Sequence, residues 1–244
     1  MEVADEYFRL ATGLFFSEKC HNTLFQDFDI GAFLTTDCFS QCLSKVLGYG
    51  VVAGSVMVKV PQIRLMLNNK SSEGVSYISN FIDLIMALST LAYGYYQKLP
   101  FATYGDSIFL FSQIAIIAML IPHLKSNKIG VFLTFAIVAA LSYSTYFKLI
   151  PFQYVQLAQT ANMPAVVVSR AIQAITNITN GHTKQLSFIT VFLSFAGCAA
   201  RVFTSLKDAE DQLLAQTFMV STAANGLILF QVIYYSYMKK QKVE

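Results

Sequence analysis

The chain has 244 residues, of which 55% are hydrophobic and only 13% are charged, and its net charge is +3. A soluble globular domain carries about 25% charged residues, so this composition excludes an ordinary soluble protein and predicts an integral membrane protein. The basic residues are scattered along the chain rather than gathered in a stripe, so no nucleic-acid partner is expected.

The amino-terminal segment, residues 1–42, is expected to form an arm at the membrane surface. It combines acidic side chains with phenylalanines and leucines, and no apolar core follows a basic start as it does in a secretory signal. We therefore predict one or two short interfacial helices over residues 1–42.

The cysteines and histidines do not predict a metal site. The four cysteines lack C-x-x-C and zinc-site spacing, so we interpret them as apolar side chains or free thiols, with a lumenal Cys20–Cys38 disulfide as the alternative. The three histidines share no helical spacing, and each is expected at an interfacial, water-facing position: His21, His123 and His182. No cofactor is expected.

From Leu43 onward, apolar stretches recur that are long enough to cross about 30 Å of hydrocarbon as helices. They lie at residues 43–66, 75–96, 104–123, 129–147, 153–176, 186–206 and 213–237. Pro61 and Pro164 remove a backbone donor from spans one and five, so both spans are expected to be broken, and the two prolines are candidate hinges.

Lysine and arginine in the short connections predict the orientation of the spans. One side collects these residues: Arg64, Lys70, Lys125, Lys128, Lys184, Lys239, Lys240 and Lys242. The arm is therefore expected to be lumenal and the tail, residues 239–244, cytosolic, which requires an odd number of spans. Two glycosylation sequons, at Asn69 and Asn177, would then face the cytosol and stay bare.

The second half of the chain repeats the first at a constant shift. This shift places Lys59 on Arg170, Gln62 on Gln173, and Phe81 on Phe192. Spans one to three thus map onto spans five to seven, and the span between them gives both halves the same orientation. The predicted fold is all-α, with seven transmembrane helices as two parallel three-helix bundles. The bundles cover residues 43–124 and 151–238 and are joined by a linker helix within residues 125–150.

The residues around the first repeat resemble the PQ-loop motif, in the run Lys59-Val60-Pro61-Gln62 and in the following run from Ser71 to Ser76. The superfamily with this motif includes the SWEET sugar transporters and lysosomal exporters of cystine and cationic amino acids. Four runs resemble, more closely, the family of mannose-P-dolichol utilization defect proteins: GYGVVAGS at 48–55, NMPAVVV at 162–168, NGHT at 180–183 and RVFTS at 201–205. The second repeat departs from the motif, because Ile172 stands where the motif has proline.

The resemblance implies a function in the endoplasmic reticulum. It implies that dolichyl-phosphate mannose and glucose require the protein for their use in lumenal glycosylation, in N-linked oligosaccharides and GPI anchors. The expected partners are the dolichyl-phosphate-linked sugar, the membrane and glycosyltransferases. Lys240 and Lys242 also resemble a dilysine retrieval signal. Two alternatives stay open: an alternating-access transporter of a small soluble sugar or amino acid, and a non-transporting chaperone of glycosylation enzymes.

Ionisable side chains within the predicted spans are candidate site residues, because a charge at the bilayer centre costs about 2.5–3.5 kcal/mol on insertion scales. They are Lys59, Asp83, Arg170 and Arg201. Since Lys59 and Arg170 are repeat mates, we hypothesise that they form a cationic pair that holds a phosphate. In the alternative, Lys59 forms a structural ion pair with Asp83, and the basic side chains reach the cytosolic interface.

Amide side chains complete the predicted substrate-binding site. Resemblance to the sugar transporters implies that Gln113 and Asn225 face a sugar hydroxyl, whereas a hydrogen bond between helices is the alternative. Gln62 and Gln173 are expected to satisfy backbone groups beside the break at Pro61. No nucleophile elbow, paired-carboxylate motif, phosphate loop or H-E-x-x-H motif occurs, so no enzyme is expected. The glycines of the run at 48–55 are expected to permit close helix packing.

Overall fold

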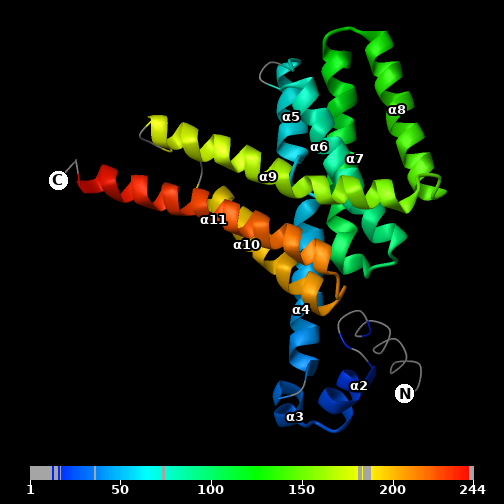
Figure 1. Cartoon of the computed structure of the whole chain (residues 1–244), viewed down its shortest axis with the longest axis vertical. Helices are drawn as coiled ribbons and strands as arrows, with labels where there is room; N and C mark the ends of the chain where they lie inside the picture. Colours follow the sequence, from blue (N-terminus) through cyan, green and yellow to red (C-terminus); the bar gives the residue numbers. More distant parts are fainter. Residues whose placement is uncertain are drawn as a thin grey trace.

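The computed structural model of the chain describes residues 13, 16, 18–35, 37–72, 75–180, 183 and 188–241, and these ranges contain helices and no strand. The all-α prediction is confirmed for this part of the chain (Figure 1). The helices are α2 (Glu18–His21), a π-helical turn (Asn22–Gln26), α3 (Ile30–Thr35), α4 (Asp37–Ser55), α5 (Val60–Asn69), α6 (Tyr77–Tyr96), α7 (Phe101–Leu124), α8 (Lys128–Tyr146), α9 (Phe152–Asn180), α10 (Phe188–Lys207) and α11 (Gln212–Gln241). His182, Lys184 and Lys242 lie outside the described residues.

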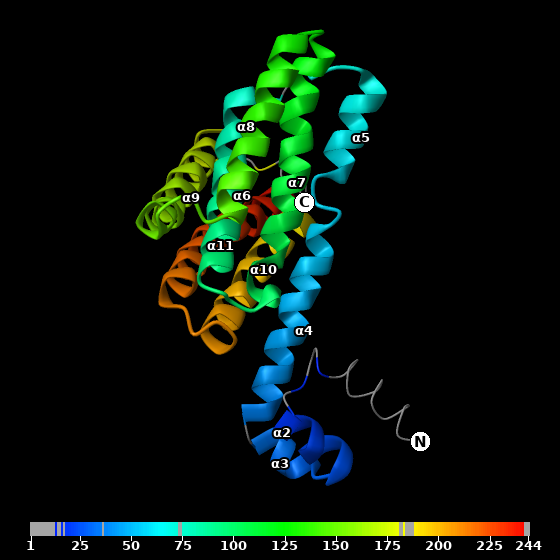
Figure 2. The same ribbon diagram turned by 90° about the vertical axis from the view of Figure 1, so that its right-hand side faces the viewer.

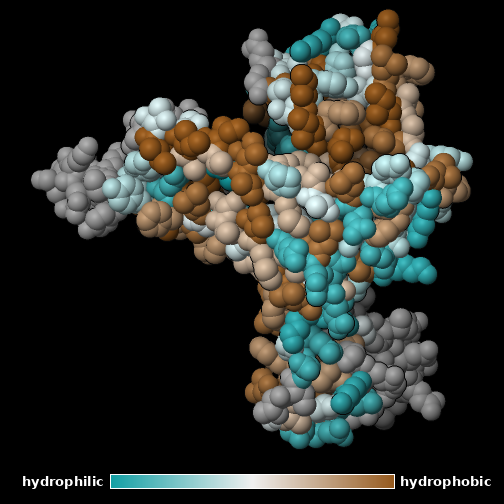
Figure 3. Space-filling model, in the orientation of Figure 1, coloured by the Kyte–Doolittle hydropathy of each residue, from teal (hydrophilic) through white to brown (hydrophobic). Residues whose placement is uncertain are grey.

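The chain is a multi-pass membrane protein. Among the described residues, four helical segments are long and apolar enough to cross a membrane: Asp37–Asn69, Phe101–Leu124, Lys128–Tyr146 and Gln212–Ser236. In the most apolar stretch of α8 only 11% of the residues are buried, and Ile129, Phe132 and Phe135 are exposed. Figure 3 shows hydrophobic surface over α8. Since water would not stabilise this surface, lipid must cover it.

Three further helices, α6, α9 and α10, coincide with predicted spans two, five and six. They are not among the segments that qualify as membrane-spanning by length and composition in the described ranges. The number of seven crossings therefore stays a prediction.

The two predicted halves are built alike. In the first half, α7 packs against both α4 and α6, and in the second, α11 packs against both α9 and α10. The halves meet where α10 contacts α4 and α7 and where α6 contacts α9, and α8 packs on α7. In Figure 1, however, α9 and α11 run across the direction of α7 and α8 rather than along it. The alignment of both halves along one membrane normal therefore also stays a prediction.

Only one of the two predicted breaks is present. Helix α4 ends at Ser55 and α5 begins at Val60, with Pro61 in the first turn of α5, where the missing N–H has no partner to lose. By contrast, α9 runs through Pro164 without interruption, so the prediction of a broken span five is wrong. Proline removes a single hydrogen bond, and a helix of 29 residues retains enough others to continue.

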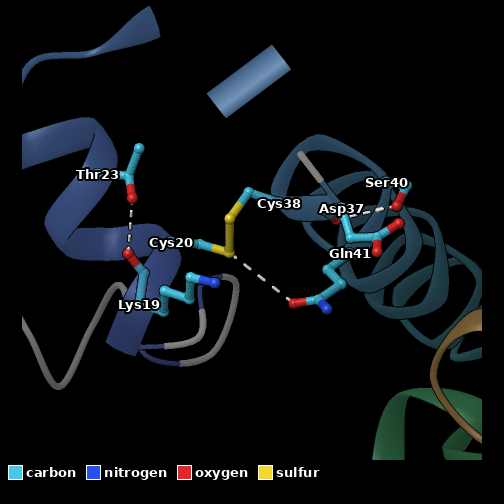
Figure 4. Close-up of a disulfide and its surroundings, with 7 residues drawn as sticks. All are labelled: Lys19, Cys20, Thr23, Asp37, Cys38, Ser40 and Gln41. Carbon is cyan, nitrogen blue, oxygen red and sulfur yellow. Dashed lines mark hydrogen bonds between the residues drawn. A yellow bond between two sulfur atoms is a disulfide. The ribbon is translucent and has the colours of Figure 1, made fainter. Parts of the chain in front are cut away.

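A disulfide joins the arm to α4, which extends from the helical body toward α2 and α3 (Figure 2). It links Cys20 to Cys38, whereas Cys42 and Cys198 are free thiols (Figure 4). Our preferred interpretation of the cysteines was therefore wrong for the first two and right for the other two. Phe33 is buried beside the disulfide. His21 is also buried here, contrary to its expected water-facing position, whereas His123 is exposed as predicted.

Candidate functional site

The break between α4 and α5 is held by Gln113 of α7. Its Oε1 atom accepts a hydrogen bond of 2.8 Å from the Lys59 backbone N–H, and its Nε2 atom donates one of 2.9 Å to the Ser55 carbonyl. One buried side chain thus satisfies backbone groups on both sides of the break. This is the role expected of Gln62, for which no hydrogen bond is found among the described residues. It also directs both polar ends of Gln113 to the backbone rather than to a sugar.

The two predicted phosphate ligands have separate partners. The Lys59 ammonium lies 3.8 Å from a carboxylate oxygen of Asp83, which is the ion pair of the alternative hypothesis. Arg170 donates a hydrogen bond of 2.7 Å from Nη1 to Oε1 of Gln173, one turn further along α9. No contact joins Lys59 to Arg170 within the described residues, so the structure does not bring the predicted cationic pair together.

Asn225, the remaining predicted ligand, is buried in α11. Its Nδ2 atom donates to the Ser221 carbonyl at 2.8 Å and lies 3.6 Å from the Cys198 sulfur of α10. Asn225 therefore links two helices of the second half, as its alternative interpretation predicts. The asparagine of the second sequon, Asn177, also links two helices. It is buried, and its side chain donates a hydrogen bond of 2.9 Å to Gln231 of α11. A buried asparagine cannot carry a glycan.

The most deeply buried ion pair of the described residues joins the two halves. Arg201 of α10 lies 2.6 Å from a carboxylate oxygen of Asp106 in α7, and the two side chains are 2% and 16% exposed. Arg201 also donates to the backbone carbonyl of Ala102 in α7. Gly48 of α4 packs on the same carbonyl, since a Cβ atom there would lie 2.9 Å from the Ala102 oxygen. Three helices thus meet around the Ala102 carbonyl.

Sequence reasoning found Arg201 but missed Asp106. Arg201 is conspicuous as a charge within a span, yet nothing in its local sequence indicates a partner in the other half of the chain. A signal for Asp106 existed, because it is an acidic residue inside predicted span three, at 104–123. Asp106 and Arg201 do not stand at equivalent positions of the two repeats, so the repeat pattern does not pair them.

A second polar cluster lies at the other contact between the halves, where α6 meets α9. Asn162 donates to Ser89 and to Gln159, each at 3.0 Å, and Thr90 bonds Gln159 at 3.0 Å. At the shift that lays Lys59 on Arg170, Thr90 is the mate of Arg201. Both contacts between the halves are therefore polar, and Thr90 and Arg201 take equivalent positions in them, although the residue types differ. We call these two contacts the polar seams.

A cavity of about 460 Å³ lies at the end of the molecule that carries the arm. It is bordered by α4 from Gln41 to Tyr49, the start of α7 and the end of α10. The polar and aromatic residues that line it are Gln41, Lys45, Tyr49, Phe101, Lys207 and Asp208. Ala102, which accepts the Arg201 hydrogen bond, belongs to the wall as well. The cavity therefore adjoins one of the polar seams.

The charges at the cavity are of both signs. Lys207 pairs with exposed Asp37 at 3.4 Å, while no described carboxylate lies within ion-pair distance of Lys45. Burial raises the pKa of Asp208, an effect that nearby Ser44 and Lys45 oppose. The Oδ2 atom of Asp208 has no hydrogen-bond partner among the described residues. This wall thus presents Lys45 as a cation without a carboxylate at ion-pair distance, whereas the unpaired Oδ2 atom of Asp208 is itself buried.

Comparison with known families identifies two related segments. The model of a family described as the PQ loop repeat matches residues 43–103 and again residues 154–214, which together make up half of the chain. The two matches begin at residues 43 and 154, and this offset is the one that lays Lys59 on Arg170, which confirms the internal repeat and its shift. No solved structure matches the chain.

Proposed function

Because the chain belongs to the PQ-loop repeat family, we propose that it binds dolichyl-phosphate mannose and glucose and presents or translocates them for lumenal glycosylation. In this proposal it resides in the endoplasmic reticulum membrane, works beside glycosyltransferases and is not itself an enzyme. Seven helices cross the bilayer in a 3+1+3 arrangement, with the arm lumenal. The resemblance to mannose-P-dolichol utilization defect proteins supplies the substrate class. The Cys20–Cys38 disulfide supports a lumenal arm, because disulfides persist in oxidising compartments.

The observation that carries the proposal is the pair of polar seams between the halves. Each seam buries hydrogen-bonding side chains, among them Arg201 with Asp106 in one and Asn162 with Gln159 in the other. A lipid-linked sugar needs a polar path for its headgroup, while its polyprenyl chain stays in hydrocarbon. A polar contact between two helical units provides such a path when the units separate, since its groups then exchange protein partners for those of the ligand.

Reconstituted vesicles test this proposal directly. A short-chain polyprenyl-phosphate mannose is placed in both leaflets, and membrane-impermeant periodate oxidises only the mannose that is exposed outside. With translocation, vesicles that contain the protein lose the whole pool, whereas protein-free vesicles lose only the outer half. Binding without loss of the inner pool indicates presentation instead. If the lipid neither binds nor moves, the proposal is refuted.

Transport of a small soluble solute is the second candidate. It is favoured by the cavity of about 460 Å³, because small-molecule sites commonly measure about 300–1,000 Å³. Uptake of free labelled hexose or amino acid by the same vesicles, with no effect on the lipid-linked sugar, would establish this function in place of the first.

A further inference from the structure

We propose that the cavity at the arm end is the headgroup site for the phosphosugar, with Lys45 and Lys207 holding the phosphate and Gln41, Tyr49 and Asp208 receiving the sugar. This inference rests on the proposed function and assigns its ligand to residues outside the predicted site. It replaces the pair of Lys59 and Arg170, which the structure does not bring together, as the source of positive charge.

The location of the cavity suits a headgroup. Its walls come from the start of α7, the end of α10 and the stretch of α4 from Gln41 to Tyr49, at the end of the molecule where the arm is attached. Figure 3 shows hydrophilic surface gathered toward this end, whereas hydrophobic surface covers α8. A ligand with a polyprenyl chain can keep that chain in lipid while its phosphate lies at this depth. A deeper cavity would require the phosphate to enter the hydrocarbon layer.

The two lysines are available to an anion. Lys45 has no carboxylate within ion-pair distance among the described residues, and it stands two turns along α4 from Asp37. Lys207 has a partner in Asp37, but these side chains are 42% and 80% exposed, and so exposed a pair contributes about 0–1 kcal/mol. A phosphate between the lysines makes charge-assisted hydrogen bonds, which are roughly twice as strong as neutral ones. Exchange of Asp37 for phosphate at Lys207 is therefore favourable.

The remaining lining matches a sugar. Amide and carboxyl groups bond pairs of hydroxyls, and Gln41 and Asp208 supply one of each. Tyr49 and Phe101 supply aromatic surface for the apolar face of a pyranose ring. Asp208 opposes a bound anion when it is ionised, but burial raises its pKa and so weakens this repulsion. A site for phosphate alone would need neither the aromatic surface nor the carboxyl group.

The disulfide adjoins the cavity wall through Gln41. Figure 4 shows Gln41 turned toward the Cys20–Cys38 bond, and its Oε1 atom lies 3.9 Å from the Cys20 sulfur. Gly13 of the arm also lines the cavity. The arm, tied to α4, therefore forms one side of the proposed site.

Binding to the full-length protein in nanodiscs tests the assignment. The probe is a short-chain polyprenyl-phosphate mannose, titrated by calorimetry into the parent, Lys207→Gln, and the double variant Lys45→Gln/Lys207→Gln. Lys98→Gln is the matched control, because Lys98 is exposed in the α6–α7 turn and does not line the cavity. We expect at least tenfold weaker binding in the double variant, a smaller loss in Lys207→Gln and no change in the control. Lys207 is well exposed, so its variant should fold and keep the test decisive.

The outcomes separate this inference from the proposed function. If the parent binds the probe and both cavity variants bind it equally well, the cavity assignment is wrong while the proposed function stands. If the parent does not bind, both fail. Competition by free mannose 1-phosphate distinguishes the source of the headgroup: equal affinity indicates a soluble phosphosugar, and weaker competition a lipid-linked one. Competition by free mannose with equal potency would overturn the role of the lysines.

Discussion

The ion pair between Arg201 and Asp106 is expected to be a main determinant of how the two halves dock. The Asp106→Asn variant retains the shape of the side chain but leaves the Arg201 guanidinium buried without a counter-ion. Since Arg201 is 2% exposed, water cannot replace the lost partner. Apart from Asp106 and the Ala102 carbonyl, to which Arg201 donates, the guanidinium has no other protein acceptor among the described residues, and its Nε atom is unpaired. Breaking one side of such a pair costs about 3–5 kcal/mol.

The magnitude can be converted into a melting temperature. For domains of this size, 1 kcal/mol corresponds to about 2–4 °C, so Asp106→Asn should lower the midpoint by about 6–20 °C. The double variant Asp106→Asn/Arg201→Gln removes both charges and should recover most of this loss, since replacing a whole buried pair is often close to neutral. Asp37→Asn is the control, because its exposed pair with Lys207 should contribute at most about 1 kcal/mol.

Circular dichroism of the purified protein in detergent measures these midpoints, because the described chain is helical. The double-mutant cycle isolates the coupling between the two side chains. If Asp106→Asn melts with the parent, or if the losses in Asp106→Asn and Arg201→Gln simply add in the double variant, the pair does not hold the halves together. The account of this polar seam would then be wrong.

Three other predictions concern packing, the disulfide and pH. Gly48→Ala should lower the melting temperature because its Cβ would meet a backbone oxygen of α7 at 2.9 Å, whereas Gly54→Ala, with nothing within 4 Å, should gain about 1 kcal/mol of helix stability. Cys20→Ser should cost about 3 kcal/mol, because the disulfide no longer closes its loop. It should also free the Cys38 thiol, so that Cys38 reacts with an alkylating reagent in addition to Cys42. An unreactive Cys38 in this variant would contradict the disulfide. Because the pKa of Asp208 is raised in the folded protein, a fall in pH through that pKa should neutralise its carboxylate and stabilise the fold. The same fall in pH should strengthen phosphosugar binding by Lys45 and Lys207. In Asp208→Asn, the dependence of binding on pH over this range should be flat.

The positions of the helices followed from local patterns. The predicted span at 129–147 matches α8, Lys128–Tyr146, closely at both ends, because lipid-facing apolar runs and polar turns are adjacent in the sequence. The repeat shift could also be predicted from the sequence, because it follows from aligning the chain with itself. Helix packing could not be predicted as well. Of the three glycines at 48, 50 and 54, only Gly48 lies against another helix, and the pattern of small residues could not select it.

The candidate site depended on contacts between distant parts of the chain. The sequence placed Lys59 and Arg170 at equivalent positions, but equivalence in a repeat does not bring two side chains together. Each has a partner in its own half instead: Asp83 for Lys59 and Gln173 for Arg170. Gln113, which satisfies the break, also lies in the same half as the break. The cavity residues come from three helices and the arm, and no local pattern joins them.

The difference between the two repeats at the break has a physical cause that can be tested. The break at residues 56–59 corresponds, at the repeat shift, to residues 167–170 in the middle of unbroken α9. The second half lacks the proline and the glutamine of the first at equivalent positions. Ile172 stands at the position of Pro61, and Ala224 stands at the position of Gln113. Alanine cannot satisfy the backbone groups that a break would free. We therefore infer that Gln113, together with Pro61, determines where the chain is broken.

The variant Gln113→Ala should consequently release the break. It leaves the partly buried Lys59 N–H without its acceptor, and since an unsatisfied donor that is fully buried costs about 1–3 kcal/mol, the cost here should lie toward the lower end. The Ser55 carbonyl retains a bond from Val58, so the effect should concentrate at Lys59. Hydrogen exchange of a peptide over residues 56–63 should become faster in Gln113→Ala and stay unchanged in Gln62→Ala. Equal protection of this peptide in the parent and in Gln113→Ala would show that the break is specified by the proline alone.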